Sequence, residues 1–410
     1  MTNSPNPGGA PKSKKPLVAV VGGPLLHTRL DLFGALRAEF DFVGIGASDQ
    51  AREAFEGHEL PFRQIPLGRG IDVIGDLRAY REMRRLFRRL RPAVVHAFQG
   101  KAAAWGRIAA RKEKVPVIVG TIEGLGTLYS PGNKHGAIAR NLYETLQRSA
   151  CRFSHLTVFQ NESDREYFVS RKIESLCKST IIPGLGIRTE IFDPGRFTGR
   201  DRESLREGLQ IPPGAPLITM VTRILRSKGV AEFAQAADLI RKRIPSAHFL
   251  LVGAVDTGAA DAHNPLEIEA LKQSVTLSGP RTDITEILAA SDIFALPTQY
   301  REGMPRSLLE AMSMALPVVT TDVPGCRDAV EDGRSGIITP PAHAGALADA
   351  IARLLDDEPL RRELGKAARV RVIERYSLGK IAALTASHYR RLLQERFGER
   401  YTPLSGHENG

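Results

Sequence analysis

The sequence predicts an α/β protein in which two doubly wound parallel sheets face a central cleft. Short apolar runs typical of buried strands alternate with amphipathic helical stretches along the chain. The same alternation starts again in the second half, after the turn-forming segments 183–186 and 194–195. Parallel sheets with helices on both faces bind ligands at the carboxyl ends of their strands. We therefore expect the functional site in a cleft between the two units.

These turn-forming segments divide the chain into two Rossmann-like domains, residues 17–190 and residues 191–384. The last helix, at about residues 385–400, has no strand after it and is expected to pack back on the first domain. Residues 1–16 are mostly Pro, Gly, Ser, Asn and Lys without an apolar run. That composition predicts a disordered tail and not a signal peptide.

The strands of the first domain are expected in six apolar runs. A helix at 71–90 stands out because apolar residues share one of its faces while six arginines between Arg78 and Arg89 crowd the others. A capping-box match at Ser163–Glu166 indicates the start of another helix. The predicted strands are Leu17–Gly23, Phe42–Ala47, Ala93–His96, Val115–Thr121, Leu156–Gln160 and Ser179–Ile182.

The second domain repeats this pattern of strands and helices. Its predicted strands are Leu217–Thr222, Phe249–Gly253, Val275–Ser278, Ile293–Leu296, Val318–Thr321 and Gly336–Thr339. Its predicted helices are Val230–Arg243, Glu267–Lys272, Ile284–Ala290, Ser307–Ala315 and Ala346–Leu355.

Composition places the chain among ordinary globular proteins. Of its 410 residues, 42% are hydrophobic and 25% are charged, and no apolar run approaches the length of a membrane span. Three scattered cysteines are too few for a disulfide framework or a zinc site. We expect a cytoplasmic protein that, if it meets a membrane, lies on the inner face of the plasma membrane.

Positive charge is concentrated in the first half of the chain. Residues 1–190 hold 29 Lys and Arg against 18 Asp and Glu, whereas residues 191–410 hold 28 of each. The partner of the first domain is therefore expected to be anionic: a phosphate, an acidic lipid or a nucleic acid. Generic basicity of an arginine-rich protein would give the same excess.

The stretch Tyr300–Glu310 is the strongest candidate for a ligand site. It follows a predicted strand, and Pro305 suits the first turn of the helix that comes next. Glu302 and Gly303 would then lie in a loop whose backbone N–H groups and positive helix end face a ligand. Glu310 follows two helical turns later. Two carboxylates around a helix start suit a polyhydroxylated ligand, although two solvated glutamates would look the same.

Other candidates follow strand ends. In the second domain, Arg223 and Lys228 could neutralise a diphosphate, and the turn at Gly279 and Arg281 could contact a flat base. In the first domain, His96 ends a strand and could donate a hydrogen bond to a ligand, although a lone histidine is more often structural. The glycine-rich loop 120–126 could shape an acceptor pocket or simply turn the chain.

Several motifs of other enzyme classes are missing from the sequence. The chain has no phosphate loop, no Gly-x-Gly-x-x-Gly after its first strand, and no Gly-x-Ser-x-Gly elbow. It also has no His-Glu-x-x-His and no Asp-x-Asp. We therefore expect neither nucleotide hydrolysis nor redox work, and neither a metal nor a bound cofactor.

These residues together resemble the retaining glycosyltransferases of family four, which have the GT-B fold. The resemblance is dense from about residue 217 to residue 355. It rests on Glu302 with Glu310, on Arg223 with Lys228-Gly229, and on segments 251–253, 291–297, 315–319, 321–327 and 331–333. Ala315 stands where the family usually has glycine. In the first half, segments 94–97 and 101–107 look like the subgroup that extends lipid-linked sugars for surface polysaccharides.

The resemblance implies a role for each candidate. Arg223 and Lys228 would hold the diphosphate of a UDP- or GDP-sugar in place of a metal. Glu302 would contact the donor sugar, helped by backbone groups around Gly303, Met304, Pro305 and Arg306, and Glu310 would hold the ribose. His96 would reach the sugar from the first domain. Gly22 and Gly23 would let the first loop approach the diphosphate.

The resemblance also implies a reaction and its partners. A sugar would pass from the nucleotide to a hydroxyl of a glycan or of a polyprenyl-diphosphate-linked sugar, with front-face attack and retention. The basic first domain would take this acceptor and meet an anionic membrane surface.

Two alternatives stay open. A sugar-nucleotide epimerase on the same fold would need no acceptor, so product analysis without acceptor separates it from a transferase. A basic nucleic-acid-binding protein would interleave aromatic residues with its cations, but aromatic residues make up only 6% of the chain. We therefore expect no nucleic-acid partner, which a gel shift would check.

Overall fold

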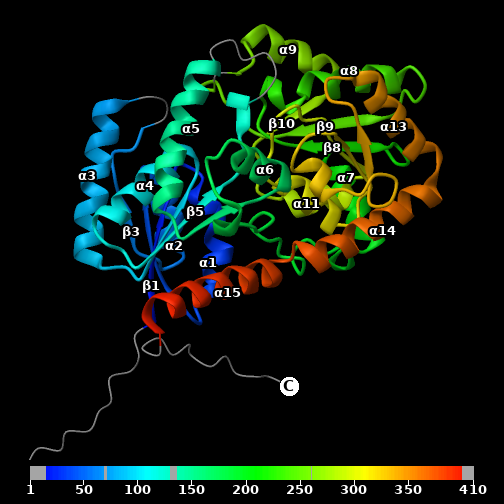
Figure 1. The fold of residues 1–410 in the computed structure, drawn as a ribbon. Coiled ribbons are helices and arrows are strands. Elements are labelled where there is room, and N and C mark those ends of the chain that lie inside the picture. Colours follow the sequence, from blue (N-terminus) through cyan, green and yellow to red (C-terminus); the bar gives the residue numbers. More distant parts are fainter. Residues whose placement is uncertain (1–14, 69–71, 130–135, 260, 399–410) are drawn as a thin grey trace, which may run out of the picture.

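Two α/β domains lie side by side in the computed structural model, each with its own parallel sheet (Figure 1). The structure describes residues 15–68, 72–129, 136–259 and 261–398. The predicted fold class, with two doubly wound sheets, is confirmed. Within the described ranges, no helix is long and apolar enough to cross a membrane.

Seven parallel strands form the sheet of the first domain, in the order β3-β2-β1-β4-β5-β6-β7. The order reverses beside β1, which is where open sheets of this type bind ligands. The strands are β1 (Leu17–Val21), β2 (Asp41–Gly46), β3 (Phe62–Gln64), β4 (Val94–Phe98), β5 (Val117–Ile122), β6 (Leu156–Phe159) and β7 (Ser179–Ile181).

Helices cover both faces of this sheet, and β1 shows why its apolar run is continuous. Val18 and Val20 pack on one face with α1 and α2, while Ala19 and Val21 pack on the other with α3 and α4. The helices are α1 (Leu30–Leu36), α2 (Asp49–Gly57), α3 (Val73–Leu90), α4 (Gly100–Lys112), α5 (Gly136–Phe153) and α6 (Glu162–Ser170).

Six parallel strands form the sheet of the second domain, in the order β10-β9-β8-β11-β12-β13. A large core joins the sheet to most of its helices, and a second, smaller cluster packs strand residues such as Leu217 and Leu250 against α7 and α10. The strands are β8 (Leu217–Val221), β9 (His248–Val252), β10 (Thr276–Gly279), β11 (Ile293–Leu296), β12 (Val318–Thr321) and β13 (Ile337–Thr339). The helices are α7 (Gly199–Gly208), α8 (Val230–Arg241), α9 (Pro265–Ser274), α10 (Ile284–Ala290), α11 (Arg306–Ser313), α12 (Cys326–Ala329), α13 (Ala344–Asp356) and α14 (Glu358–Arg375).

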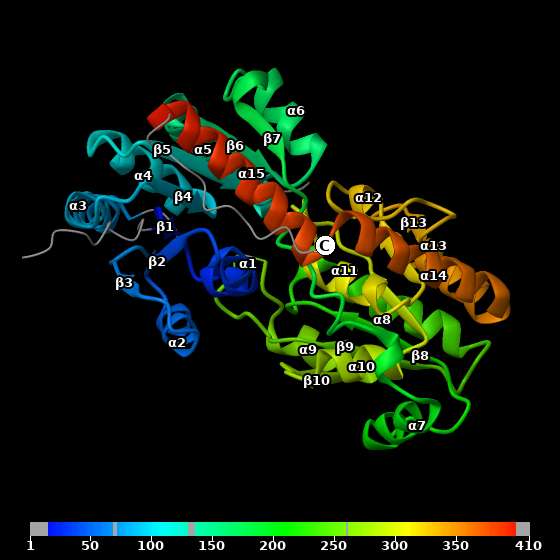
Figure 2. The ribbon, with the colours of Figure 1, turned by 90° about the horizontal axis from the view of Figure 1, so that it is seen from below.

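The last helix, α15 (Leu378–Phe397), leaves the second domain and lies across the first (Figures 1 and 2). Its residues Ile381, Tyr389 and Leu393 belong to the same core as the strands and helices of the first domain. The chain therefore crosses between the domains twice, and the first domain is completed only by the C-terminal helix.

Two local details differ from the sequence-based expectation. Helix α6 begins at Glu162 and is capped by Asn161, not by Ser163, because the Asn161 side chain accepts the Asp164 N–H. Pro305 is the N-cap of α11, and its first helical residue is Arg306. Of the predicted tail, residues 1–14 lie outside the described residues, whereas the Pro16 carbonyl already accepts a bond from the Asp41 N–H.

Candidate active site

A cavity of about 230 Å³ lies between the domains at the carboxyl edges of both sheets. The loop between β11 and α11 forms its wall on the second domain, with Glu302 and Arg306 among the lining residues. Arg29, Gln99 and Glu123 line it from the first domain. The cleft predicted from the sequence is therefore present, and the two carboxyl edges face each other across it.

Lys228 and Glu302 form an ion pair in this cleft. The Lys228 Nζ lies 2.5 Å from the Glu302 Oε1, and both side chains are about nine-tenths buried. The Thr298 hydroxyl donates to the same oxygen at 3.2 Å, and the ammonium sits 4.2 Å from the centre of the Tyr300 ring. Two positions predicted separately, 74 residues apart, thus meet as one neutralised pair.

Gly229 allows this arrangement because it brings the Lys228 turn close to the end of β11. Its φ is +77°, and a Cβ built there would lie 1.9 Å from the Pro297 carbonyl oxygen. A larger residue at position 229 would clash with this carbonyl oxygen, so the position of Lys228 depends on the glycine that follows it.

Arg306 and Glu310 form a second pair, at the start of α11. The Arg306 Nε lies 2.8 Å from a Glu310 oxygen. The guanidinium also donates to the Thr28 carbonyl at 3.2 Å and lies 3.6 Å from Asp31, both in the first domain. Burial raises the pKa of Glu310, and the positive charge of Arg306 opposes that shift. The two domains therefore meet through Arg306.

Arg223, Gly279 and Arg281 lie at the carboxyl ends of their strands but do not line the cavity. Arg223 follows β8, is 47% exposed and pairs with Asp256 at 2.8 Å. Arg281 follows the edge strand β10 and pairs with Asp283, next to Gly279, whose φ is +70°. Neither arginine contacts the Lys228–Glu302 pair in this structure.

His96 is placed differently from the expectation that it faces a ligand. Its ring is 4% exposed, and both nitrogens are occupied: Nδ1 lies 2.6 Å from the Tyr389 hydroxyl and Nε2 lies 2.7 Å from the Thr121 hydroxyl. Burial, with two nearby arginines, lowers its pKa to about 3. In this arrangement the neutral ring ties β4 to β5 and to α15.

Gly22 and Gly23 form the turn after β1, as predicted. The Gly22 N–H donates to the Ile45 carbonyl at 3.0 Å. Gly23 lies against the side-chain oxygen of Gln99, which a Cβ would approach to 2.8 Å. The turn therefore lies on the cleft side of the first domain, beside the start of α4.

Several cleft residues of the first domain were not among the predicted site residues, among them Arg29, Gln99 and Glu123. Arg29 is 2% exposed, forms an ion pair with Glu123, and stacks on the Phe98 ring at 4.7 Å. Burial lowers the pKa of Arg29 to about 9. Gln99 caps α4 with a φ of +63°, and its buried side-chain oxygen has no hydrogen-bond partner among the residues that the structure describes. Only the loop that holds Glu123 carried a sequence signal.

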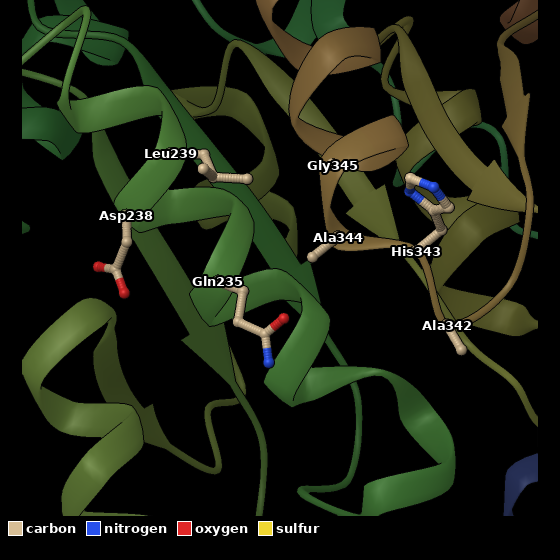
Figure 3. Close-up of a pocket in the computed structure, with 7 residues that line it drawn as sticks. All are labelled: Gln235, Asp238, Leu239, Ala342, His343, Ala344 and Gly345. Carbon is tan, nitrogen blue, oxygen red and sulfur yellow. The ribbon is translucent and has the colours of Figure 1, made fainter.

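Outside the cleft, a hollow of about 550 Å³ lies between α8 and α13 (Figure 3). Its His343 caps α13, since Nδ1 accepts the Ala346 N–H at 2.9 Å, which gives this histidine a structural role. The described part of the chain has no group of three or more His, Cys, Asp or Glu side chains placed to hold a metal ion.

Both halves of this chain are similar in sequence to known proteins. Residues 201–371 match the family model of group 1 glycosyl transferases, and residues 28–175 match the model of the glycosyl transferase 4-like domain. A Campylobacter jejuni N,N'-diacetylbacillosaminyl-diphospho-undecaprenol alpha-1,3-N-acetylgalactosaminyltransferase is 32% identical, over 65% of this chain and 69% of its own length. An Escherichia coli UDP-Gal:alpha-D-GlcNAc-diphosphoundecaprenol alpha-1,3-galactosyltransferase is 28% identical, over 77% and 79%.

Solved structures share the fold. A Rickettsia africae glycosyltransferase superposes with a TM-score of 0.76 at 18% identity, covering 93% of this chain and 99% of its own. Anabaena Alr3699/HepE, solved with UDP, gives 0.75 at 20% identity, over 92% and 99%.

With its two facing sheets and the cleft between them, the chain has the GT-B fold. Within that fold class, the chain belongs to the family-four glycosyltransferases, as its motifs had indicated. It is an enzyme, a glycosyltransferase.

Proposed function

We propose that this enzyme is a metal-independent, retaining transferase that moves a sugar from a UDP- or GDP-sugar to a lipid-linked glycan. The observation that carries the proposal is the buried Lys228–Glu302 pair beside the start of α11, inside the interdomain cleft. The pair offers a cation to a departing phosphate and a carboxylate to sugar hydroxyls within one hydrogen-bonded unit.

The donor would lie along α11. Glu302, with the backbone around Gly303 and Met304, would hold the sugar at the helix N-terminus, where N–H groups and the dipole favour oxygen acceptors. Glu310, one turn into the helix, would hold the ribose hydroxyls, and its raised pKa suits a group in a water-poor pocket. Arg223 would swing from Asp256 to the diphosphate together with Lys228.

The ion pair between Glu302 and Lys228 supports retention by front-face attack. A carboxylate held by an ammonium at 2.5 Å is a weak nucleophile, so it suits binding better than covalent catalysis. In the proposed step, the bond between the anomeric carbon and the diphosphate oxygen breaks. The acceptor oxygen then bonds that carbon on the same face, and its proton passes to the departing phosphate.

The acceptor would enter from the first domain. The Campylobacter and Escherichia relatives are named for diphospho-undecaprenol-linked substrates, which supports an acceptor of that chemistry. Exposed apolar side chains mark the first two turns of two helices: Ile74 and Leu77 on α3, Ile138 and Leu142 on α5. Both helices lead into strands of a parallel sheet and so begin at its carboxyl edge, on the side of the cleft. We therefore place the enzyme on the cytoplasmic face of an anionic membrane.

Substitution of Glu302 tests the proposed donor site. We expect Glu302→Ala to lower transfer by about 100-fold or more, because it removes a contact to the sugar in the transition state. Binding of bare UDP or GDP should persist, since these lack the sugar. The measurements are a thermal-shift panel of nucleotide sugars, then turnover and nucleotide affinity.

Glu269→Ala is the matched control, because Glu269 is exposed on α9 and, within the described part of the chain, pairs only with Lys272. It should leave transfer unchanged. Unchanged turnover of Glu302→Ala would remove Glu302 from the mechanism. Loss of activity with a chelator would contradict metal independence, and an inverted anomeric product would contradict retention. Sugar isomerised without acceptor would point to an epimerase.

A further inference from the structure

Helix α6 of the first domain begins directly behind the donor loop of the second domain. Asn161, its N-cap, is 1% exposed, and its side-chain oxygen accepts the Asp164 N–H at 2.8 Å. The carboxamide oxygen therefore makes the ordinary hydrogen bond of an N-cap residue. The carboxamide nitrogen points across the domain boundary.

The Asn161 Nδ2 group reaches the main chain of the loop that holds Glu302. It donates to the carbonyl oxygens of Glu302 and Gly303, each at 3.0 Å. Asn161 and Glu302 stand 141 residues apart, in different domains. One buried side chain therefore caps a helix of the first domain and holds two consecutive peptide groups of the second.

An ion pair reinforces this contact one residue away in the loop. Asp164 is fully buried, and its carboxylate accepts from the Arg301 guanidinium at 2.8 Å and 3.1 Å. Burial raises the pKa of Asp164, and Arg301 opposes that shift. A buried carboxylate without this partner would be costly, so the ion pair depends on the two domains being in contact.

The backbones of the two domains also approach closely at this point. A Cβ built on Gly124 would lie 2.5 Å from the Gly303 nitrogen, and one built on Gly303 would lie 2.5 Å from the Glu123 carbonyl oxygen. The Gly126 N–H donates to the Arg301 carbonyl at 3.2 Å. The backbone of the loop 123–126 therefore packs directly on the backbone of the donor loop, while Asn161 holds the donor loop's carbonyl groups.

We propose that Asn161 is a positioning residue through which the first domain orders the Glu302–Gly303 loop, with Asp164 and Arg301 stabilising the contact. The donor-sugar site is then complete only when the two domains are in contact, as Asn161 and Asp164 are with the donor loop in this structure. This inference rests on the proposed role of Glu302 in holding the donor sugar. It adds that closure of the domains, and not the second domain alone, sets the geometry of that loop.

Asn161→Ser tests this inference. Serine is also a strong N-cap, so α6 keeps its cap, but the shorter side chain does not reach the two carbonyls. We expect kcat to fall by about 10- to 100-fold through misplacement of the sugar contact. The affinity for UDP or GDP should stay within about twofold. Asn161→Asp, which turns an oxygen toward both carbonyls, should lower kcat further.

Asn264→Ser is the matched control, because Asn264 caps α9 with the same side-chain geometry and contacts no residue of the donor loop. Its kcat should equal that of the wild type. A pure capping role predicts a lower melting temperature with unchanged kcat for Asn161→Ser, and that result would overturn the inference. Parallel loss of nucleotide affinity and kcat would overturn it as well.

The same measurements separate this inference from the proposed function. If Glu302→Ala abolishes transfer while Asn161→Ser does not change kcat, the donor site stands and the positioning role fails. If Glu302→Ala transfers normally, the proposed donor site itself fails.

Discussion

At the scale of single residues, the burial of His96 is the clearest case in which packing decides chemistry. The ring sits between the Tyr389 and Thr121 hydroxyls and stacks on Phe98 at 4.0 Å between ring centres. A protonated imidazole there would carry an unpaired charge in an apolar core, which is why its pKa falls to about 3.

This burial predicts an acid-sensitive fold. Because the folded pKa lies below the unfolded value of about 6.5, the unfolded chain takes up the proton first. The stability from His96 is therefore fully present above about pH 6.5 and is lost as the pH falls toward 3. Between pH 7 and pH 5 this amounts to about 2 kcal/mol. Urea unfolding at both pH values would measure it.

His96→Asn should be less stable at pH 7 and lose less stability on going to pH 5. Other partly buried histidines add to the acid loss in every variant, so the difference from the wild type isolates His96. His248→Asn is the control, since the partly exposed His248 side chain has, among the described residues, a hydrogen bond only to the nearby Ser246 carbonyl. Equal acid losses in His96→Asn and the wild type would contradict the burial argument.

At the scale of elements, the two ends of α11 differ in how well their residues suit the local backbone conformation. The start of the helix near Pro305 and Arg306 could be predicted from the sequence because Pro tolerates only a few helix positions. The other end carries Ala315 where the family usually has glycine. Ala315 adopts φ +55°, the left-handed conformation that glycine occupies without steric cost.

Ala315→Gly should therefore stabilise the protein. Relief of the left-handed strain, about 1–2 kcal/mol, exceeds the added entropy of a glycine in the unfolded chain. We expect the free energy of unfolding to rise by about 0.5–1 kcal/mol, measured by chemical denaturation of the second domain.

Ala342→Gly is a related test, since Ala342 also has φ +55° but lies in the loop before α13. A gain at both positions would confirm strain as the cause. A loss of stability in Ala315→Gly would show that the methyl group contributes more through packing than it costs.

At the scale of the whole molecule, the charge and apolar surface of the first domain predict membrane binding. On α3, Arg84 and Arg88 both pair with Glu113, while Arg78 and Arg81 have no ion pair among the described residues. Figures 1 and 2 show α3, α4 and α5 in a row along one face of the first sheet. Cations and the exposed apolar turns of α3 and α5 therefore occupy the same side of the domain.

We expect the protein to sediment with phosphatidylglycerol vesicles at low salt and to dissociate as salt rises. Ile138→Ser should weaken binding by about tenfold at fixed charge, because Ile138 is 84% exposed and free to insert. Leu266→Ser is the control, since Leu266 is 82% exposed on the second domain. Equal binding to neutral vesicles at low salt would contradict the role of charge.

Much of the fold followed from local patterns. Apolar runs buried on both sheet faces predicted each strand of the second domain to within one or two residues, because the hydrophobic pattern is a property of neighbouring residues. The loop Tyr300–Glu310 was found in the same way. The cap of α6 was not, because Ser163 and Asn161 are equally good caps and only the packed loop selects one.

What the sequence determined by itself is therefore the fold class, the family and the second-domain half of the cleft, all of which rest on contiguous motifs. Only the tertiary structure decided which first-domain residues complete that cleft. Arg29 lines it and Asn161 holds the carbonyls of its donor loop from behind, while His96 is buried against Tyr389, 293 residues away in the chain. The reason is physical: these contacts depend on how the two domains and α15 pack together, and no local period records that packing.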